Sequence, residues 1–224
     1  MEYFSYFLEE QTRQHIDSYE LLLKLTSDEL GPLEEEFGRE VATISTENYR
    51  KTAESVVEKI LRSKGELTRE NFIREMDDLV RFRILCNYLS DVKTVVSLIK
   101  ESKPILGKFK IIDIEDRIWE VRIPSDDTKI EDERRRKRLT GVRGYYLVFQ
   151  DKESSEVKIE VQVITLLENA WDRKDHHLVY ELERRGVEVN QISKLRVKSI
   201  SDMLYVADEY FDVLRKELEE QGRG

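Results

Sequence analysis

The stretch over residues 158–177 constrains the fold more than any other part of the chain. Over 158–165, apolar and polar residues alternate with the period of a strand that has one buried face. The apolar members of this alternation would face a core: Ile159, Val161 and Val163. Glu160 and Gln162 would then share the opposite face. Residues 166–177 switch to helical spacing and carry an asparagine, a tryptophan and two adjacent histidines. The sequence therefore predicts a strand that presents a carboxylate to a cleft and leads into a polar helix.

The composition is that of a heavily charged globular protein. Of 224 residues, 39% are hydrophobic and 38% are charged, which is typical of a folded chain and not of a disordered one. The net charge of −9 disfavours a protein that coats nucleic acid broadly, although it allows a local basic pocket. No apolar run approaches the ~20 residues of a membrane span, and the acidic amino terminus lacks the apolar segment of a signal peptide.

The single cysteine, Cys86, excludes two kinds of structural element. One cysteine cannot form an internal disulfide, and it cannot supply a multi-cysteine zinc site. Because disulfides are common in secreted proteins and rare in the cytoplasm, we expect a cytoplasmic protein that has no membrane partner.

Hydrophobic spacing divides the chain into helical ends and a central sheet. Helical spacing predicts helices over residues 6–26, 28–41, 46–64, 68–76, 91–101, 165–184 and 190–219, the second of them following a Ser-Asp capping pair. Strand-forming residues predict strands over 79–88, 108–114, 119–123, 144–150 and 156–164. A tight turn that starts at Glu115-Asp116 would join the second and third strands, and residues 151–155 would form a hairpin loop between the last two.

This order of elements indicates an α+β fold, with a mixed, largely antiparallel sheet of about five strands flanked by helices. No repeat and no linker rich in proline or glycine divides the chain. We therefore expect one globular unit with three segments. These are an N-terminal helical extension over residues 1–45, a central domain over 46–184 and a C-terminal helical extension over 185–224.

Two carboxylates lie on or beside different predicted strands. Asp78 precedes the strand over 79–88, and Glu160 lies within the strand over 156–164. If these strands are neighbours, both carboxylates could point into one cleft and hold Mg²⁺, a cation that prefers oxygen ligands. Because the chain has 47 acidic residues, a chance pair of solvated carboxylates is the competing interpretation.

Cations cluster at several points along the chain. Lys51, Lys59 and Arg62 are spaced so that one helical face could present all three. The other cations that could join them are Arg50, Arg81, Arg83, the run Arg134–Arg138, and Arg143. Such a set suits a polyphosphate, whose oxygens accept charge-assisted hydrogen bonds. A surface crossed by salt bridges is the alternative in so charged a chain.

The glycines and histidines do not indicate two common kinds of site. The segment Gly141-Val142-Arg143-Gly144 matches neither the P-loop nor the dinucleotide-binding fingerprint. His176 and His177 are adjacent on a predicted helix, so their side chains diverge by about 100° and cannot easily share one metal ion. We interpret His176 as a hydrogen-bond donor in a cleft or as a helix-packing residue.

Taken in order, these residues resemble the synthetase domain of the RelA/SpoT family, especially its small, stand-alone alarmone synthetases. The resemblance runs from about Arg50 to Tyr180. The family's Glu-x-Gln-x-x-Thr, Asn-x-Trp and acid-His-x-x-x-Tyr motifs are matched by Glu160, Gln162, Thr165, Asn169, Trp171, Asp175, His176 and Tyr180. Further matches are Asp78 with Arg83, the helix residues Glu54, Ser55, Lys59 and Arg62 with Lys51 upstream, and an echo of the Asn-Gly-Tyr-Arg-Ser loop at 140–144.

The resemblance implies a nucleotidyltransferase-like synthetase fold and an enzyme that moves pyrophosphate from ATP to the 3′-hydroxyl of GDP or GTP, releasing AMP. It implies that Asp78 and Glu160 bind Mg²⁺ and that Glu160 also activates the attacking hydroxyl. ATP would be bound by Lys51, Lys59 and Arg62 at its phosphates, and by Arg50 and Arg83 at the adenine. The acceptor nucleotide would be bound by Arg138, Arg143, Gln162, Asn169 and His176.

The chain departs from the family pattern chiefly around the acceptor. Val142 stands where the family has a tyrosine that stacks on guanine, a contact of about 1–3 kcal/mol. Arg81 replaces a small residue, Tyr146 a histidine, Ile164 an arginine and Glu181 a basic residue. Two alternatives follow: transfer to an adenine nucleotide or to the 3′ end of a tRNA, or a catalytically weak nucleotide-binding domain with a regulatory role. The long terminal helices permit a homo-oligomer.

Overall fold

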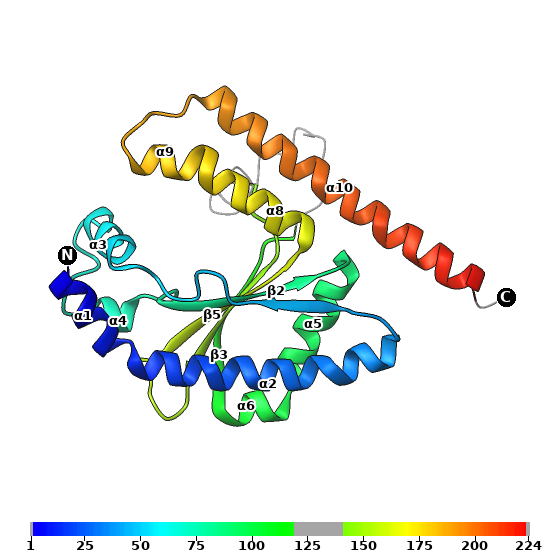
Figure 1. Cartoon of the computed structure of the whole chain (residues 1–224), viewed down its shortest axis with the longest axis horizontal. Coiled ribbons are helices and arrows are strands. Elements are labelled where there is room, and N and C mark those ends of the chain that lie inside the picture. Colours follow the sequence, from blue (N-terminus) through cyan, green and yellow to red (C-terminus); the bar gives the residue numbers. More distant parts are fainter. Residues whose placement is uncertain (1, 119–140, 223–224) are drawn as a thin grey trace, which may run out of the picture.

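The computed structural model describes residues 2–118 and 141–222, which form a five-stranded sheet with helices on both faces (Figure 1). The strands lie in the order β1 (Ala42–Ser45), β2 (Val80–Cys86), β5 (Lys158–Thr165), β4 (Tyr145–Asp151) and β3 (Phe109–Asp116). β2 and β5 are parallel, whereas the other three neighbouring pairs are antiparallel. The predicted fold class, an α+β fold with a mixed and largely antiparallel sheet, is confirmed.

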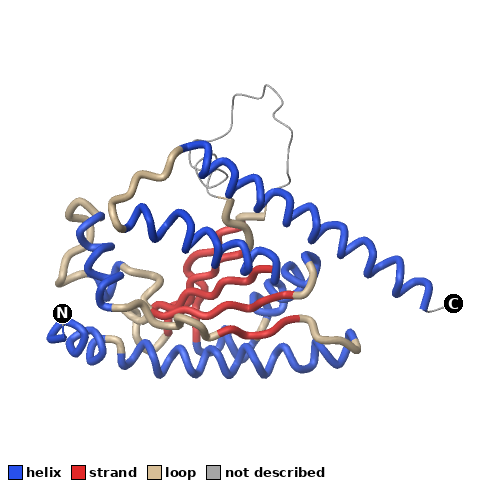
Figure 2. Tube along the Cα trace, turned by 45° about the horizontal axis from the view of Figure 1, so that its top comes forward, coloured by secondary structure: helices blue, strands red, loops and turns tan. Residues whose placement is uncertain are grey.

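The helices form two layers and an end cap around this sheet (Figures 1 and 2). One face is covered by α2 (Arg13–Phe37), α5 (Leu89–Glu101) and α6 (Lys103–Lys108). The other face is covered by α8 (Leu166–Asp175), a π-helical turn η1 (His176–Tyr180), α9 (Glu181–Arg184) and α10 (Gln191–Gly222). α1 (Glu2–Gln11), α3 (Ala53–Arg62) and α4 (Phe72–Glu75) gather at one end of the sheet.

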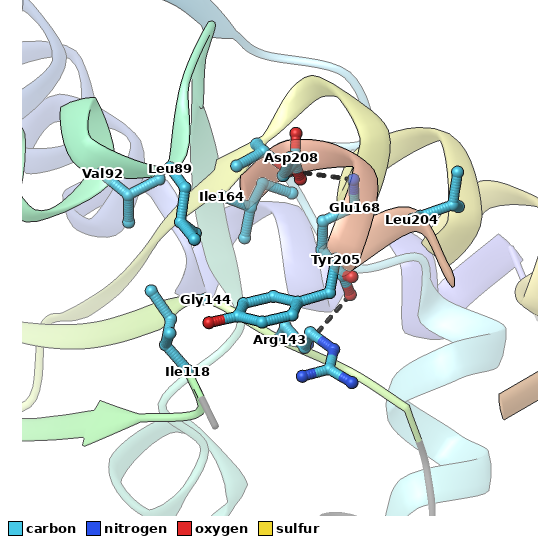
Figure 3. A pocket seen from close by; sticks show the side chains of 11 residues that line it. Leu89, Val92, Ile118, Arg143, Gly144, Ile164, Glu168, Leu204, Tyr205 and Asp208 are labelled. Carbon is cyan, nitrogen blue, oxygen red and sulfur yellow. Dashed lines mark hydrogen bonds between the residues drawn. The ribbon is translucent and has the colours of Figure 1, made fainter. Parts of the chain in front are cut away.

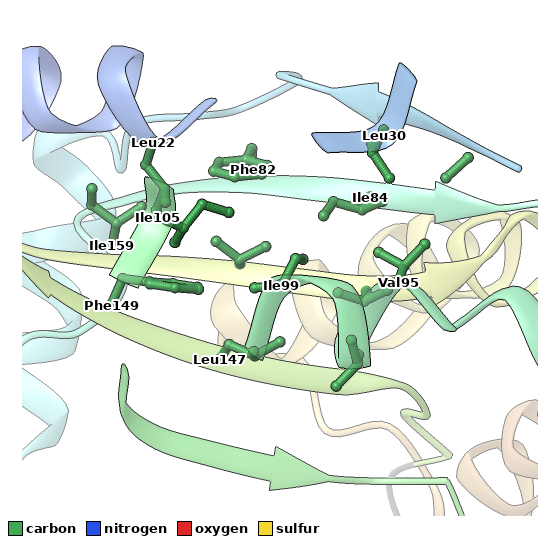
Figure 4. Close-up of a cluster of buried hydrophobic side chains, with 14 of the residues drawn as sticks. Leu22, Leu30, Phe82, Ile84, Val95, Ile99, Ile105, Leu147, Phe149 and Ile159 are labelled. Carbon is green, nitrogen blue, oxygen red and sulfur yellow. The ribbon is translucent and has the colours of Figure 1, made fainter. Parts of the chain in front are cut away.

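The main hydrophobic core lies between the sheet and the layer made by α2, α5 and α6 (Figure 4). β2 shows strict alternation, with every second side chain buried, so Phe82 and Ile84 enter the core while the residues between them face the other layer. The same face of β5 contributes the three predicted core residues, Ile159, Val161 and Val163, all of which are buried. The predicted strand over residues 158–165, with one buried face, is therefore confirmed.

The N-terminal helices differ from the prediction. Residues 27 and 28 do not cap a new helix, because α2 continues without interruption from Arg13 to Phe37 and includes Pro32. Its buried face includes Leu22, Leu30 and Leu33, so packing against the sheet favours one long helix over two short ones. The helix ends at Gly38, which adopts a positive φ of 62° and donates its backbone N–H to the last turn.

One missed strand and two element boundaries also differ from the prediction. The sequence did not indicate β1, whose four residues pair with β2. Glu115-Asp116 does not start a turn, because β3 continues through both residues and pairs with β4 up to Asp116. The predicted helix over 46–64 begins only at Ala53, since Thr52 is its N-cap and accepts a hydrogen bond from the Ser55 N–H. The predicted strand over 119–123 lies outside the described residues.

Among the described residues, no helix is long and apolar enough to cross a membrane. α2 and the sheet share one core, so the N-terminal extension packs as part of the same unit as the sheet. The division into segments at residues 45 and 184 stays a prediction.

Candidate functional site

Glu160 lies on β5, and Asp78 lies just before β2, the strand that is parallel to β5. Asp78 precedes β2 by two residues, and Glu160 on β5 lies opposite Arg81 of β2 in the strand register. The next pair on the same face is Arg83 with Gln162. Because their neighbours Phe82 and Val161 fill the core, Arg81 and Glu160 project toward the opposite layer of helices. Asp78 and Glu160 lie close enough for the charge of Asp78 to raise the pKa of Glu160.

A cleft of about 470 Å³ opens beside this face. It lies between the chain that leads into α3, the start of β2 and the segment formed by η1 and α9, and its lining is strongly polar. The residues that line it are Asn48, Arg50, Lys51, Thr52, Ser55, Asp78, Arg81, His176, Tyr180 and Arg184. Hereafter it is called the charged cleft.

Asp78 is held by two ammonium groups. Its Oδ2 lies 2.6 Å from the Lys51 Nζ, and its Oδ1 lies 2.8 Å from the Lys59 Nζ. Burial acts to raise the pKa of Asp78, but the charges and hydrogen bonds of Lys51 and Lys59 outweigh it and lower that pKa. Asp78 is therefore an anion at neutral pH, and it orients two of the three cations that the resemblance assigned to the phosphates of ATP.

The pKa of Glu160 is shifted in the opposite direction to that of Asp78. Burial raises its pKa, and the nearby charge of Asp78 raises it further, against a hydrogen bond from Gln162 and the charges of Arg81 and Lys51. The Gln162 Nε2 donates to the Glu160 Oε1 at 2.5 Å and so orients the carboxylate. A carboxylate with a raised pKa in a partly buried site has the properties of a general base.

Arg50 and Arg62, which the resemblance also assigned to ATP, differ in their relation to the charged cleft and in their partners. The Arg50 guanidinium, which lines the cleft, is 3.3 Å from the Glu9 carboxylate of α1. Arg62 donates to the Tyr180 hydroxyl at 3.2 Å and lies over its ring. The adjacent residues Arg50 and Lys51 line the charged cleft, whereas Arg62 of α3 is linked to it through Tyr180.

Arg83 is bound to residues that the sequence assigned to the acceptor and not to the adenine. Its guanidinium donates to the Gln162 Oε1 and to the Asn169 Oδ1, each at 2.8 Å. It also forms an ion pair with Asp172 at 2.5 Å. The structure thus brings Arg83, Gln162 and Asn169 together on the polar face of the sheet, under α8.

His176 and Tyr180 line the charged cleft from the π-helical turn. Their rings are tilted toward each other with centroids 4.8 Å apart, and the His176 Nδ1 is 3.7 Å from the Glu181 carboxylate. A π-helical turn inside a helix is rare and is often found at functional sites. Its position here agrees with the predicted role of His176 as a cleft residue.

Arg143 does not reach the charged cleft. Its side chain is buried against α10, where it pairs with Asp202, donates to the Ser201 hydroxyl at 3.3 Å and lies 4.5 Å from the centre of the Tyr205 ring. Figure 3 shows Arg143 and Tyr205 beside a small pocket of about 20 Å³, which residues of β5, α5, α8 and α10 line. Arg138 and the basic run Arg134–Arg138 lie outside the described residues.

Two charged residues of the site, Arg184 and Asp172, were not predicted from the sequence. Arg184 lines the charged cleft and is paired with Glu58 at 2.6 Å. Asp172 binds Arg83 and lies three residues after Asn169 on α8, so helical spacing could have identified it. No local signal identifies Arg184, because its position depends on how α9 packs beside α3.

The donor set fits a magnesium ion that also binds substrate phosphates. No group of three or more His, Cys, Asp or Glu side chains that could hold a metal is found among the described residues. Mg²⁺ at phosphate-transfer sites usually takes only one or two carboxylates and completes its shell with water and phosphate oxygens. Asp78 and Glu160 could supply these two carboxylates, because each is an oxygen donor and their charges interact.

Comparison with known proteins gives concordant results. Residues 49–185 match a family model described as "Region found in RelA / SpoT proteins". The chain is 22% identical over 182 residues to GTP pyrophosphokinase YwaC of Bacillus subtilis, covering 78% of this chain and 74% of that protein.

Two solved structures share the fold. The small alarmone synthetase 1 of Bacillus subtilis, bound to its product pppGpp, is 22% identical with a TM-score of 0.68, covering 95% of this chain and 97% of that one. A GTP pyrophosphokinase family protein from Streptococcus pneumoniae is 20% identical with a TM-score of 0.68, covering 95% of each chain. Because the identities are low, the likeness to these two structures shows that the fold is shared.

Proposed function

The chain belongs to the RelA/SpoT family, and from this premise we propose that it is an ATP-dependent pyrophosphokinase that transfers pyrophosphate to the 3′-hydroxyl of GDP or GTP. The proposal rests chiefly on the proximity of Asp78 and Glu160, whose charges interact, beside a cleft that Asp78 lines together with several cations. A phosphate-transfer site needs positioning and positive charge more than it needs a covalent group, and this arrangement offers both.

Glu160 is the general base of the proposed reaction. It takes the proton of the 3′-hydroxyl as the hydroxyl oxygen forms a bond to the β-phosphorus of ATP. The bond between that phosphorus and the oxygen it shares with the α-phosphate breaks, and AMP leaves. The hydrogen bond from Gln162 orients the Glu160 carboxylate, and general-base assistance of this kind contributes typically about 10²–10⁴-fold in rate.

The cations of the cleft neutralise the triphosphate. Lys51 and Lys59 are fixed by Asp78, so their charges are positioned before ATP arrives. Arg62 lies nearby on α3 and would contact the phosphates with them. Arg50 would contact the adenine from the rim of the cleft, where Glu9 now holds it. Asp78 and Glu160 would hold Mg²⁺, which when bound neutralises charge on the phosphate oxygens.

The acceptor would lie on the side of α8. Arg83, Gln162 and Asn169 form a connected polar set there, and His176 lies farther along the same helical segment. Arg138 would contact the acceptor's phosphates. For Arg143 the same assignment requires the side chain to leave Asp202 of α10, which holds it in this conformation.

The burial of Arg143 favours a second candidate acceptor. An arginine that is bound to α10 cannot also bind the phosphates of a guanosine nucleotide, and Val142 offers no ring for stacking. Transfer to an adenine nucleotide or to the 3′ end of a tRNA is therefore the alternative, with the same donor and the same base. A catalytically weak regulatory domain is the third reading.

A transfer assay separates these candidates. The purified chain is incubated with Mg²⁺ and ATP labelled at the γ-phosphate, and GDP, GTP, unlabelled ATP or tRNA is added in turn. We expect label on GDP or GTP together with AMP release. Label that is transferred only to an adenosine nucleotide or to tRNA would show that this molecule, and not GDP or GTP, is the acceptor. The absence of transfer to any acceptor would favour the catalytically weak regulatory domain.

We also propose a homo-oligomer formed through α10, in a cytoplasmic protein. The outer face of this helix exposes large apolar residues over several turns: Met203, Tyr210, Phe211, Leu214 and Leu218. A second copy could cover this stripe by packing its own α10 against it. Light scattering on the wild type and on Tyr210→Glu tests this: a loss of mass in the variant supports it, and a wild-type monomer contradicts it.

A further inference from the structure

Arg81 differs from the other cations of the charged cleft in having no bound partner. Arg50 is paired with Glu9, Lys51 with Asp78, and Arg184 with Glu58. Within the described part of the chain, Arg81 is the one cleft-lining cation whose side chain forms no ion pair and no hydrogen bond.

The position of Arg81 is defined by the sheet. It lies on β2 three residues after Asp78, and its Cα pairs with that of Glu160 in the parallel register. The burial pattern of β2 places Val80 and Phe82 in the core, so the Arg81 side chain projects to the face that carries Glu160. The backbone N–H of Arg81 donates to the Tyr49 carbonyl at 2.7 Å, which anchors this part of the strand to the chain that enters α3.

An unpaired guanidinium beside two carboxylates is suited to an anionic ligand. A phosphate that binds Lys51 must share that ammonium with Asp78, whereas a phosphate that binds Arg81 breaks no hydrogen bond or ion pair, although the charge of Arg81 also acts on Glu160. The guanidinium offers several N–H donors in a planar fork that matches the geometry of phosphate oxygens. It would also screen the repulsion between an incoming polyphosphate and the charge of Glu160.

We propose that Arg81 binds the β- and γ-phosphates of the donor nucleotide and positions them beside Glu160. The inference deepens the proposed function: it rests on ATP as the donor and adds a residue that contacts the group to be transferred. It also explains why an arginine next to the candidate metal ligands is compatible with activity, since the charge lies where the phosphates arrive.

The test compares nucleotides that differ only in their phosphates. Isothermal titration calorimetry measures the Kd for ATP, ADP and AMP in buffer with Mg²⁺ for the wild type, Arg81→Ala, Arg81→Lys and Arg74→Ala. Arg74 is a matched control because it is an exposed arginine on α4, paired only with Glu75 and outside the charged cleft. The thermal unfolding temperature of each variant is measured alongside.

We expect Arg81→Ala to raise the Kd for ATP about tenfold or more and to change the Kd for AMP less than threefold, because a lost charge-assisted hydrogen bond affects only the ligand that makes it. Arg81→Lys, which also serves if Arg81→Ala fails to fold, should raise the Kd for ATP several-fold. Arg74→Ala should bind like the wild type.

Two results would overturn the proposal. One is an unchanged Kd for ATP in folded Arg81→Ala, and the other is an equal loss for ATP and AMP, which would mark a structural role. These results are independent of catalysis. If the wild type transfers no pyrophosphate and yet binds ATP through Arg81, the proposed reaction fails while the phosphate-binding role of Arg81 is supported.

Discussion

The Lys51 ammonium lies 2.6 Å from the Asp78 carboxylate, although the two residues are 27 positions apart in the chain. Lys59 binds the other carboxylate oxygen at 2.8 Å. Two residues that the sequence assigned separately, one to a metal and the other to ATP, thus form one unit. The pairing lowers the pKa of Asp78 against the effect of burial, and it fixes the lysines where a triphosphate would bind.

Lys51→Met is expected to reduce kcat/KM for pyrophosphate transfer by roughly 10²-fold or more, because it removes a fixed charge that stabilises the transferring group. The matched control is Lys93→Met, which replaces an exposed lysine on α5, on the opposite side of the sheet. Initial rates of AMP release measured at several ATP concentrations provide the comparison. If Lys51→Met stays within threefold of the control, Lys51 has no part in the reaction.

His15 predicts an acid-sensitive contribution to stability. It is buried in α2, and burial lowers the pKa of its imidazole below the ordinary value of 6.5, against opposing effects of Glu156. The unfolded chain therefore binds a proton near pH 6.5 that the folded chain binds only at lower pH. The His15 contribution is present above pH 6.5 and is lost as the pH falls below that value.

Urea unfolding at pH 7.5 and at pH 5.5 measures this effect. Relative to the wild type, His15→Leu should lose less of its free energy of unfolding between the two pH values. His177→Leu, which replaces an exposed histidine, should follow the wild type. An unchanged pH dependence in His15→Leu would show that the buried imidazole is not the group that titrates.

Glu168 predicts a loss of stability on the alkaline side. Burial raises its pKa to about 8 from an ordinary 4.5, with a hydrogen bond from the Arg143 N–H acting in the opposite direction. The folded chain thus keeps a proton that the unfolded chain releases near pH 4.5. Stability from this group is complete below about pH 4.5 and is lost as the pH rises through about 8.

Glu168→Gln should remove this dependence, because the amide oxygen can still accept the Arg143 hydrogen bond while no charge forms. We expect a higher free energy of unfolding than the wild type at pH 8.5 and a smaller difference at pH 5. Glu188→Gln, at an exposed position, is the control. Equal pH profiles for the wild type and Glu168→Gln would contradict the assignment.

The sequence predicted the sheet well where one strand has one buried face. Ile159, Val161 and Val163 alternate with polar residues, and this local period defines the face on which Glu160 projects. The same reasoning failed at residues 27 and 28, where a good capping pair lies inside α2. There the burial of Leu22 and Leu30 against the sheet outweighs a local helix-start signal, and a pattern read within one segment cannot show this packing.

The sequence predicted which residues belong to the site better than it predicted which of them form ion pairs and hydrogen bonds with one another. The motif resemblance selected Asp78, Glu160 and Lys51, and the structure brings them together. It could not indicate that Arg143 would bind Asp202, because that contact joins segments 59 residues apart and depends on how α10 packs. Arg83 likewise pairs with Asp172 through the docking of α8 on the sheet.

Gly144 is a position where a side chain should destabilise the fold. Its φ is +123°, and an added Cβ would lie 2.8 Å from the Val163 carbonyl oxygen, close to the Ile164 side chain. Gly144→Ala should lower the free energy of unfolding by about 1–3 kcal/mol through strain and overpacking. Gly107→Ala, where a Cβ meets nothing within 4 Å, should not destabilise. Equal urea midpoints for the two variants would contradict the crowding at Gly144.

The catalytic role of the two carboxylates is tested by measuring the transfer of labelled pyrophosphate by the wild type, Glu160→Gln and Asp78→Asn, with GDP or GTP as acceptor. We expect transfer with AMP release in the wild type and a loss of at least about 10²-fold in rate in Glu160→Gln at an unchanged unfolding temperature. Asp78→Asn should be similarly impaired. Transfer by Glu160→Gln at the rate of the wild type would contradict the claim that these two carboxylates form the catalytic centre.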